Sequence, residues 1–201
     1  VREKLAYYEN ALQMLPESAN HYEEIAANVE ALRAAQPKDL DASEIEVRLG
    51  ATWIDKEYIR QFMVETFEPP YYMRRSIEVN YSPYTAEWSI TNKTNAGRSS
   101  LAAYLTYGTD RANAYKILED TLNLRDVRIY DTKTDADGKE RRVLNSKETT
   151  LAQQKQQAIK DAFRDWIWRD PHRRETLSTK YNELFNSTRP REYDGSHIRF
   201  G

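Results

Sequence analysis

Apolar residues recur every three or four positions between Asn145 and Asp170, and this is the strongest pattern of the chain. Such spacing places them on one face of a helix. The residues on this face are Leu151, Ala152, Ala158, Ile159, Ala162, Phe163, Trp166 and Ile167. We expect the Trp166 ring to lie in the core. Asp170-Pro171 ends the helix, since proline disfavours a helical residue before it and suits the first turn of a following helix.

A second C-terminal helix is predicted after this break. Its apolar positions are Leu177, Tyr181, Leu184 and Phe185. Residues 146–201 are therefore expected to form a helical hairpin and a basic tail. Near the start of the chain, residues 2–15 and 18–35 show two further helical patterns. We expect residues 1–38 to be an N-terminal helical segment.

Polar and apolar residues alternate in the middle of the chain, as they do in strands. The predicted strands form two hairpins, Ser76–Tyr81 with Glu87–Thr91, and Val127–Thr132 with Arg141–Leu144. Asp137-Gly138 supplies the tight turn of the second hairpin, because glycine tolerates positive φ. We expect the two hairpins to pair or pack together under the helices.

Helices are also predicted from near Asp55, and from Asp110 to Leu122 with Thr109 or Asp110 as the cap. Residues 44–50 should be extended and residues 92–100 a loop. Residues 39–145 would then be an α+β module with two β-hairpins. The expected fold is a helix-rich α+β single domain with two small antiparallel hairpins and a C-terminal helical hairpin.

Composition fits a soluble globular chain. It has 201 residues, of which 39% are hydrophobic and 31% are charged, and it has no cysteine. The absence of cysteine excludes disulfides and thiolate metal sites, and we expect a cytoplasmic protein without a membrane span. Because the chain starts at Val1 without methionine, we expect a domain of a longer protein. The net charge of −2 is uneven: residues 1–70 hold 7 Lys and Arg against 14 Asp and Glu, whereas residues 146–201 hold 11 against 8.

The motifs of common catalytic sites are missing. There is no phosphate-binding G-x-x-x-x-G-K-[ST] loop and no G-x-S-x-G elbow. The three histidines are scattered, so no metal site is expected. Glu68-Pro69-Pro70-Tyr71 is similar to the [Asp/Asn/Ser]-Pro-Pro-[Tyr/Phe/Trp] motif of amino-methyltransferases, but its first residue differs and it follows a helix instead of a strand. We expect the chain itself to be non-catalytic, although an enzyme with a site of another kind stays open.

Basic residues interleaved with aromatic ones are the remaining functional signal. Such mixtures suit phosphate contacts and base stacking. The candidate DNA-binding residues are Arg169, His172, Arg173, Arg174, Lys180, Arg189, Arg191 and Arg199. The candidate stacking residues are Trp168 and Tyr193. The alternative is that the arginines are solvated surface residues and that the tryptophans belong to the core.

Short blocks of sequence carry a resemblance to a known family. They are Glu44–Ile54, Tyr107–Arg111, Leu122–Leu124, Tyr130-Asp131, Val143–Asn145, Thr149–Lys155, Phe163–Ile167, Tyr181–Asn186 and Tyr193–His197. Read together over residues 20–201, the chain resembles the central region of the large methylase–helicase polypeptides of bacterial conjugative elements and phages. In that family an N6-adenine DNA methyltransferase domain lies upstream, and a helicase domain of the SNF2 type begins just after the last block.

The resemblance implies a parent polypeptide that binds DNA, S-adenosylmethionine and ATP. No cofactor is expected in this chain, since the family's cofactor-binding motifs lie outside it. The chain would be a non-catalytic module that binds or positions DNA between the methyltransferase and helicase parts. The alternative is a structural coupling domain that docks these neighbouring domains without contacting DNA. A contiguous basic surface favours the first function, and an exposed apolar patch favours the second.

Overall fold

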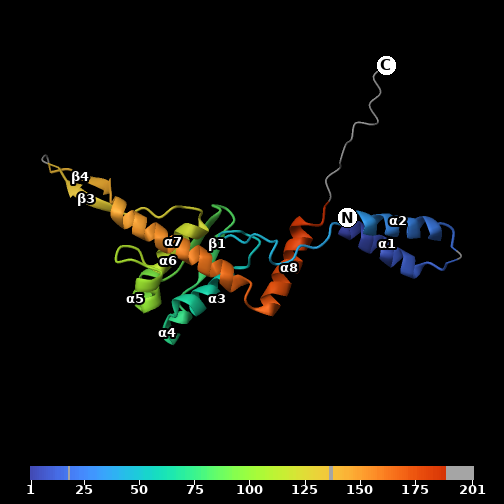
Figure 1. The fold of residues 1–201 in the computed structure, drawn as a ribbon, viewed down its shortest axis with the longest axis horizontal. Helices are drawn as coiled ribbons and strands as arrows, with labels where there is room; N and C mark the ends of the chain where they lie inside the picture. Colours follow the sequence, from blue (N-terminus) through green and yellow to red (C-terminus); the bar gives the residue numbers. More distant parts are fainter. Residues whose placement is uncertain (18, 136–137, 189–201) are drawn as a thin grey trace, which may run out of the picture. The chain divides into compact units, whose positions relative to one another are not determined.

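The computed structural model describes residues 1–17, 19–135 and 138–188 (Figure 1). The helices are α1 (Arg2–Met14), α2 (Tyr22–Ala35), α3 (Lys56–Phe67), α4 (Tyr71–Arg74), α5 (Lys93–Arg98), the π-helix η1 (Ala102–Thr106), α6 (Ala114–Leu122), α7 (Ser146–Ile167) and α8 (Pro171–Phe185). The strands are β1 (Val79–Ser82), β2 (Glu87–Ile90), β3 (Tyr130–Thr134) and β4 (Glu140–Leu144). The helix-rich α+β fold, its two small antiparallel hairpins and its C-terminal helices are thus confirmed.

Backbone contacts divide the chain into two compact units, where the sequence predicted one domain. The central unit is Glu46–Arg174, and the terminal unit combines Val1–Ile45 with the segment that begins at Glu175. These boundaries differ from the expected segments 1–38, 39–145 and 146–201. The reason is that α7 packs against α3 and α6 and so belongs to the central unit, whereas most of α8 belongs with the N-terminal residues.

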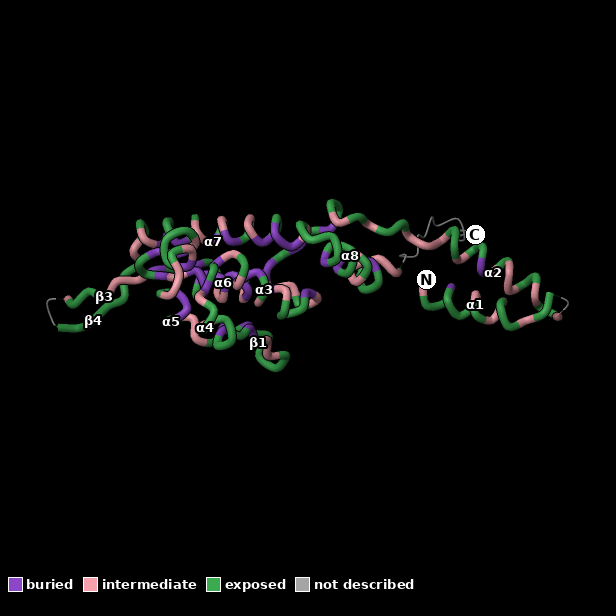
Figure 2. The backbone as a smooth tube through the Cα atoms, turned by 90° about the horizontal axis from the view of Figure 1, so that it is seen from below, coloured by how far each residue is buried: buried purple, intermediate pink, exposed green. Residues whose placement is uncertain are grey.

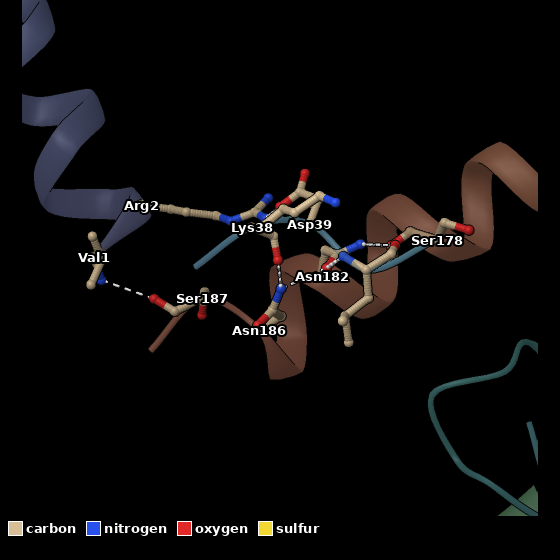
Figure 3. A network of polar contacts seen from close by, with 9 residues as sticks. Val1, Arg2, Lys38, Asp39, Ser178, Asn182, Asn186 and Ser187 are labelled. Atoms are coloured by element: carbon tan, nitrogen blue, oxygen red, sulfur yellow. Dashed lines mark hydrogen bonds and ion pairs between the residues drawn. The ribbon is translucent and has the colours of Figure 1, made fainter. Parts of the chain in front are cut away.

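In the terminal unit, α8 holds an extended segment by its asparagines. Asn182 is buried, and its side-chain amide pairs with both backbone groups of Leu40. The Leu40 N–H donates to Oδ1 at 2.8 Å, and Nδ2 donates to the Leu40 carbonyl at 2.9 Å. One turn later, Asn186 donates to the Lys38 carbonyl at 2.8 Å (Figure 3). The same unit contains α1 and α2, which lie side by side.

An aromatic cluster forms the core of the central unit. Phe62 of α3 meets Phe163 of α7 edge-on, with ring centroids 5.1 Å apart, and Phe67 meets Tyr115 of α6 at the same distance. All four side chains are fully buried. Figure 2 shows the buried residues concentrated on α3, α6 and α7, which are the elements that the apolar periodicity predicted.

The two hairpins form separate two-stranded sheets, so the expectation that they would pair or pack together under the helices is wrong. The first hairpin joins β1 to β2 and packs against α3 and α6. Along the open edge of β2, the side chain of Asn123 pairs with both backbone groups of Trp88 at 2.8 and 2.9 Å. Glu119 of α6 accepts a hydrogen bond from the Ile90 N–H at 2.7 Å. Residues of and next to α6 therefore stand in for a third strand.

An extended segment before β3 is fixed in the same way by α7. The Val127 N–H donates to Gln156, and the Val127 carbonyl accepts from Gln153. Thr149 accepts from the Ile129 N–H at 3.0 Å and donates to the Ile129 carbonyl at 3.3 Å. These side chains satisfy a buried backbone that no strand accompanies. The segment was predicted as part of a strand, but the strand proper begins at Tyr130.

Other predicted bounds shift for local reasons. Residues 92–100, expected to be a loop, contain the short helix α5, and the π-helix η1 follows it. The cap of α6 is Asn113, whose side chain accepts from the Lys116 N–H, and not Thr109 or Asp110. Thr109 instead closes a turn by bonding the Ala112 N–H at 3.0 Å.

Trp166 lies at the C-terminal end of α7, where several groups converge on its ring. Its indole N–H donates to Glu65 of α3 at 2.6 Å, and the side chain is only 4% exposed. The guanidinium of Arg173 lies 3.6 Å from the centre of the Trp166 ring. That guanidinium also donates to the carbonyls of Trp166 and Ile167 at 2.7 and 2.9 Å. The predicted core position of Trp166 is confirmed, and Arg173 closes the end of the helix.

Replacing Trp166 with alanine should lower the free energy of unfolding by about 3–5 kcal/mol, because it empties a buried site between α3 and α7. Urea unfolding followed by circular dichroism measures the change. Trp168→Ala is the matched control, since this side chain is only half-buried, and it should cost clearly less. A loss below about 1 kcal/mol for Trp166→Ala would contradict the core assignment.

Replacing Arg173 with alanine should lower the free energy of unfolding by about 1–3 kcal/mol, since two helix-end carbonyls lose a charged donor and the Trp166 ring loses its cation. The neighbouring exposed residue provides the control: Arg174→Ala should change stability by about 0.5 kcal/mol or less. Equal effects of the two substitutions, measured by urea unfolding, would show that Arg173 is not structural.

Candidate nucleic-acid interface

The predicted cations near the α7–α8 connection have different environments. Arg169, His172 and Arg174 are exposed, whereas Trp168 and Lys180 are half-buried. Arg174 donates from Nε to the Trp168 carbonyl at 2.9 Å, so part of its donor capacity serves the end of α7. The exposed cations can still reach a phosphate group.

Arg173 does not share this accessibility. Its side chain is 8% exposed, and its guanidinium lies on the Trp166 ring and on two carbonyls of α7. A phosphate contact would require the guanidinium to leave these partners and expose them. The prediction of Arg173 as a DNA-binding residue is therefore wrong: spacing alone does not separate a buried cation from the exposed ones beside it.

Arg169 lines a cleft of about 480 Å³ whose other charged side chains are acidic. They are Glu65, Glu68 and Asp165. Three carboxylates around one arginine produce a local potential that disfavours a phosphate. Glu68 belongs to the Glu68-Pro69-Pro70-Tyr71 segment, where it ends α3 in a left-handed conformation with φ 50°. This segment therefore acts as a helix stop followed by the short helix α4.

Four predicted contacts fall in the C-terminal tail. Arg189, Arg191, Arg199 and the stacking candidate Tyr193 lie outside the residues that the structure describes. Their contacts with DNA stay predictions.

An exposed element of the central unit that carries several cations is the hairpin of β3 and β4, residues 130–144, here named the arm. Figure 1 shows the arm extending beyond the N-terminal end of α7, and Figure 2 shows it exposed along most of its length. Every residue of β4 is exposed. The register places Lys133 directly opposite Arg141, and Thr132 opposite Arg142. Neighbouring positions alternate between faces, so cations project from both faces of the arm.

Acidic residues on the arm lie toward its two ends. Asp135 near the tip accepts a hydrogen bond from the Lys139 N–H at 3.0 Å, and its other oxygen lies 3.4 Å from Nε of Arg141. Over residues 130–144 the formal charges balance, with four Lys and Arg against four Asp and Glu. Lys133, Arg141 and Arg142 are grouped in the middle of the arm, between Asp131 at its base and Asp135 near its tip.

The base of the arm is fixed by a polar network. Arg111 donates to Asp131 at 2.9 Å and to the Tyr130 carbonyl at 2.9 Å. Asn145, the N-cap of α7, donates to the other oxygen of Asp131 at 2.8 Å. Hydrogen bonds from Arg111 and Asn145 lower the pKa of the Asp131 carboxyl below its ordinary value. The network is therefore ionised at neutral pH and is lost only when the pH falls through that lowered pKa.

Three blocks behind the family resemblance meet in this network: Tyr107–Arg111, Tyr130-Asp131 and Val143–Asn145. Two others meet at Gly50, whose φ is 91° and where an added Cβ would lie 2.3 Å from the Leu122 carbonyl oxygen. Residues of these blocks thus position elements of the fold.

The remaining large cleft of the central unit has mixed charge. It measures about 400 Å³ and lies between residues 46–49, the end of α6 and α7. Arg48 pairs with Glu46 at 2.9 Å and Arg164 with Asp161 at 2.7 Å. Within the part of the chain that the structure describes, no group of three or more acidic or histidine side chains could hold a metal ion. No helix in that part is long and apolar enough to cross a membrane.

The hairpin was predicted from the sequence, but the arm was not among the candidate binding residues. The available signal was the strand Glu140–Leu144, in which apolar residues do not alternate with polar ones. A strand without an apolar face has no side to bury. A count of net charge over long stretches does not reveal the cations of the arm, because the arm carries equal numbers of basic and acidic residues.

Comparison with known proteins assigns a family without a described activity. No curated protein and no solved structure matches the chain. The family described as Domain of unknown function (DUF8437) matches residues 48–187, which include nearly all of the central unit and α8. Since this match covers well over half of its 201 residues, the chain belongs to that family of domains of unknown function.

Proposed function

We propose that this chain is a non-catalytic module that binds or positions DNA between the methyltransferase and helicase parts of a larger mobile-element methylase. The observation that carries the proposal is the pairing of Lys133 with Arg141 on an exposed hairpin. Like charges directly opposite each other destabilise a strand pair. Asp131 and Asp135 offset part of this cost, and an anionic ligand beside the two cations would offset more of it.

The distribution of charge supports the same surface. The central unit carries 22 Lys and Arg against 19 Asp and Glu, while the rest of the chain carries 8 against 13. DNA would therefore meet the central unit, and the acidic residues of the N-terminal segment 1–45 would not contact the phosphates. In this proposal S-adenosylmethionine and ATP bind to the neighbouring domains, as the family resemblance implies, and the present chain contributes only the grip on DNA.

A specific observation favours the second function, a structural coupling domain that docks those neighbours without contacting DNA. Leu101 and Leu105 lie one turn apart at η1 and are 75% and 57% exposed. Tyr104 of the same helix is partly exposed and donates its hydroxyl to Asp110 at 2.7 Å. Adjacent exposed leucines are typical of a surface that a partner covers.

The DNA proposal predicts salt-dependent binding by the purified chain. Fluorescence anisotropy with a labelled DNA should give an affinity that falls linearly on logarithmic axes between about 50 and about 200 mM salt, because each phosphate contact releases a counterion. An uncharged peptide nucleic acid of the same sequence is the matched control and should not bind. Absence of DNA binding at the lower salt concentration would refute this function.

The coupling alternative predicts a different phenotype. Changing Leu101 and Leu105 to serine should alter the free energy of unfolding by about 0.5 kcal/mol or less per site, because both side chains are exposed. It should also weaken association with separately expressed methyltransferase or helicase domains, measured by calorimetry. Leu124→Ser is the control, since this leucine is 81% exposed on another element. Unchanged association would exclude a docking role for η1.

A further inference from the structure

We propose that the arm enters the major groove of B-form duplex DNA and that Lys133, Arg141 and Arg142 make the contacts. This inference rests on the proposed function, and it adds the form of nucleic acid, the groove and the residues. The supporting observations are the dimensions of the arm, its surface chemistry and the way in which its base is held.

The dimensions of the arm select the groove. Neighbouring strands lie about 4.8 Å apart, so a two-stranded ribbon with side chains fits a major groove about 12 Å wide and not a minor groove about 6 Å wide. Each strand of the arm has five residues, which corresponds to a length of about 16 Å. Because the major groove is about 8.5 Å deep, side chains in the middle of β3 and β4 can reach base edges while the base of the arm remains outside.

The surface chemistry of the arm excludes a platform for single strands. Binding to single-stranded nucleic acid uses exposed aromatic rings on which bases stack. Tyr130 is the one aromatic residue on the arm strands, and it is half-buried with the Arg142 guanidinium 4.7 Å from its ring centre. The ring is therefore occupied by a cation, and the arm presents charge without a free stacking surface. An A-form RNA duplex is excluded on other grounds, since its major groove is too narrow for side chains to read.

The charges of the arm suit the two walls of a groove. Lys133 and Arg141 share one face, while Arg142 projects from the other face. Among the described residues no carboxylate lies within salt-bridge distance of Lys133 or Arg142, although Asp131 attracts Lys133 at longer range and Arg142 lies over the Tyr130 ring. Both side chains are exposed and keep donors for phosphates or base edges. Arginine can also bond guanine through two parallel hydrogen bonds in this groove.

A fixed base lowers the cost of binding. The network of Arg111, Asp131 and Asn145 joins β3 to the N-cap of α7. The Asn145 N–H also donates to the Ile129 carbonyl at 2.8 Å, next to the segment that Thr149 holds. Because the arm is oriented before DNA arrives, less conformational entropy is lost on association.

The experiment compares the wild-type chain with the variant Lys133→Ala/Arg141→Ala/Arg142→Ala on a labelled DNA duplex. The slope of log affinity against log salt should decrease by about 0.9 for each lost phosphate contact. The variant should keep the fold of the central unit, measured by circular dichroism, because all three side chains are exposed and contribute nothing to its buried core. Lys133→Gln, which removes the charge but keeps a polar side chain, provides a milder variant and should reduce the slope by about 0.9 alone.

The matched control removes three exposed lysines elsewhere in the central unit, Lys56, Lys116 and Lys160. This variant has the same net charge as the arm variant and should keep the wild-type slope. Equal losses in both variants would overturn the assignment to the arm. An arm variant that binds like the wild type would overturn it as well while leaving DNA binding intact. If the wild type binds no DNA at low salt, the proposed function itself fails and this inference falls with it.

Three further nucleic acids and one competitor test the groove and the form of nucleic acid. The wild type should bind a single strand and an RNA duplex of the same sequence more weakly than the DNA duplex. Bulky substituents on the pyrimidine 5-positions, which fill the major groove, should weaken binding, whereas a minor-groove ligand such as netropsin should not compete. Equal affinity for RNA or for the single strand, or displacement by netropsin, would overturn the major-groove assignment.

Discussion

Side chains on or next to helices form the backbone hydrogen bonds that a neighbouring β-strand would otherwise supply, and the rest of the fold depends on these bonds. Asn123 satisfies both backbone groups of Trp88, and Asn182 does the same for Leu40. Thr149 forms hydrogen bonds with both backbone groups of Ile129. Gln156 and Gln153 do the same for Val127. Buried N–H and C=O groups require partners, and an amide side chain offers one acceptor and one donor in a plane. The chain can thus pack extended segments against helices without building a larger sheet.

The arm is the extended element that lacks this support beyond its base. The network of Arg111, Asp131 and Asn145 ends at Asp131, and the described residues farther along carry no helix side chain along their outer edges. An isolated two-stranded hairpin is only marginally stable in water. The network of Arg111, Asp131 and Asn145 therefore orients an element that adds little to the core. This arrangement is expected of an element that contacts a ligand or partner.

How much the sequence could predict depended on the range of the interaction. The apolar spacing of α7 placed Trp166 in the core, and Asp170-Pro171 marked the break before α8, because both signals are local. The burial of Arg173 was not predictable from its basic neighbours, since it depends on the Trp166 ring one helix earlier. The burial of Gln156 was not predictable from its neighbours either. This polar side chain is buried because its amide bonds the Val127 N–H and the Arg125 carbonyl, about thirty residues earlier in the chain.

Charges on an exposed hairpin have another established use, the protection of open strand edges against pairing with other chains. Edge protection alone does not account for the arm. Any charged residue protects an edge, and opposite charges at facing positions would protect it while stabilising the strand pair. The arm instead sets Lys133 against Arg141, and the Asp131 and Asp135 carboxylates relieve this pair in part, Asp131 by attracting Lys133 and Asp135 at 3.4 Å from Arg141. A sequence shaped only by stability would place an acidic residue at one of the two positions, so the retained like-charge pair points to an anionic ligand.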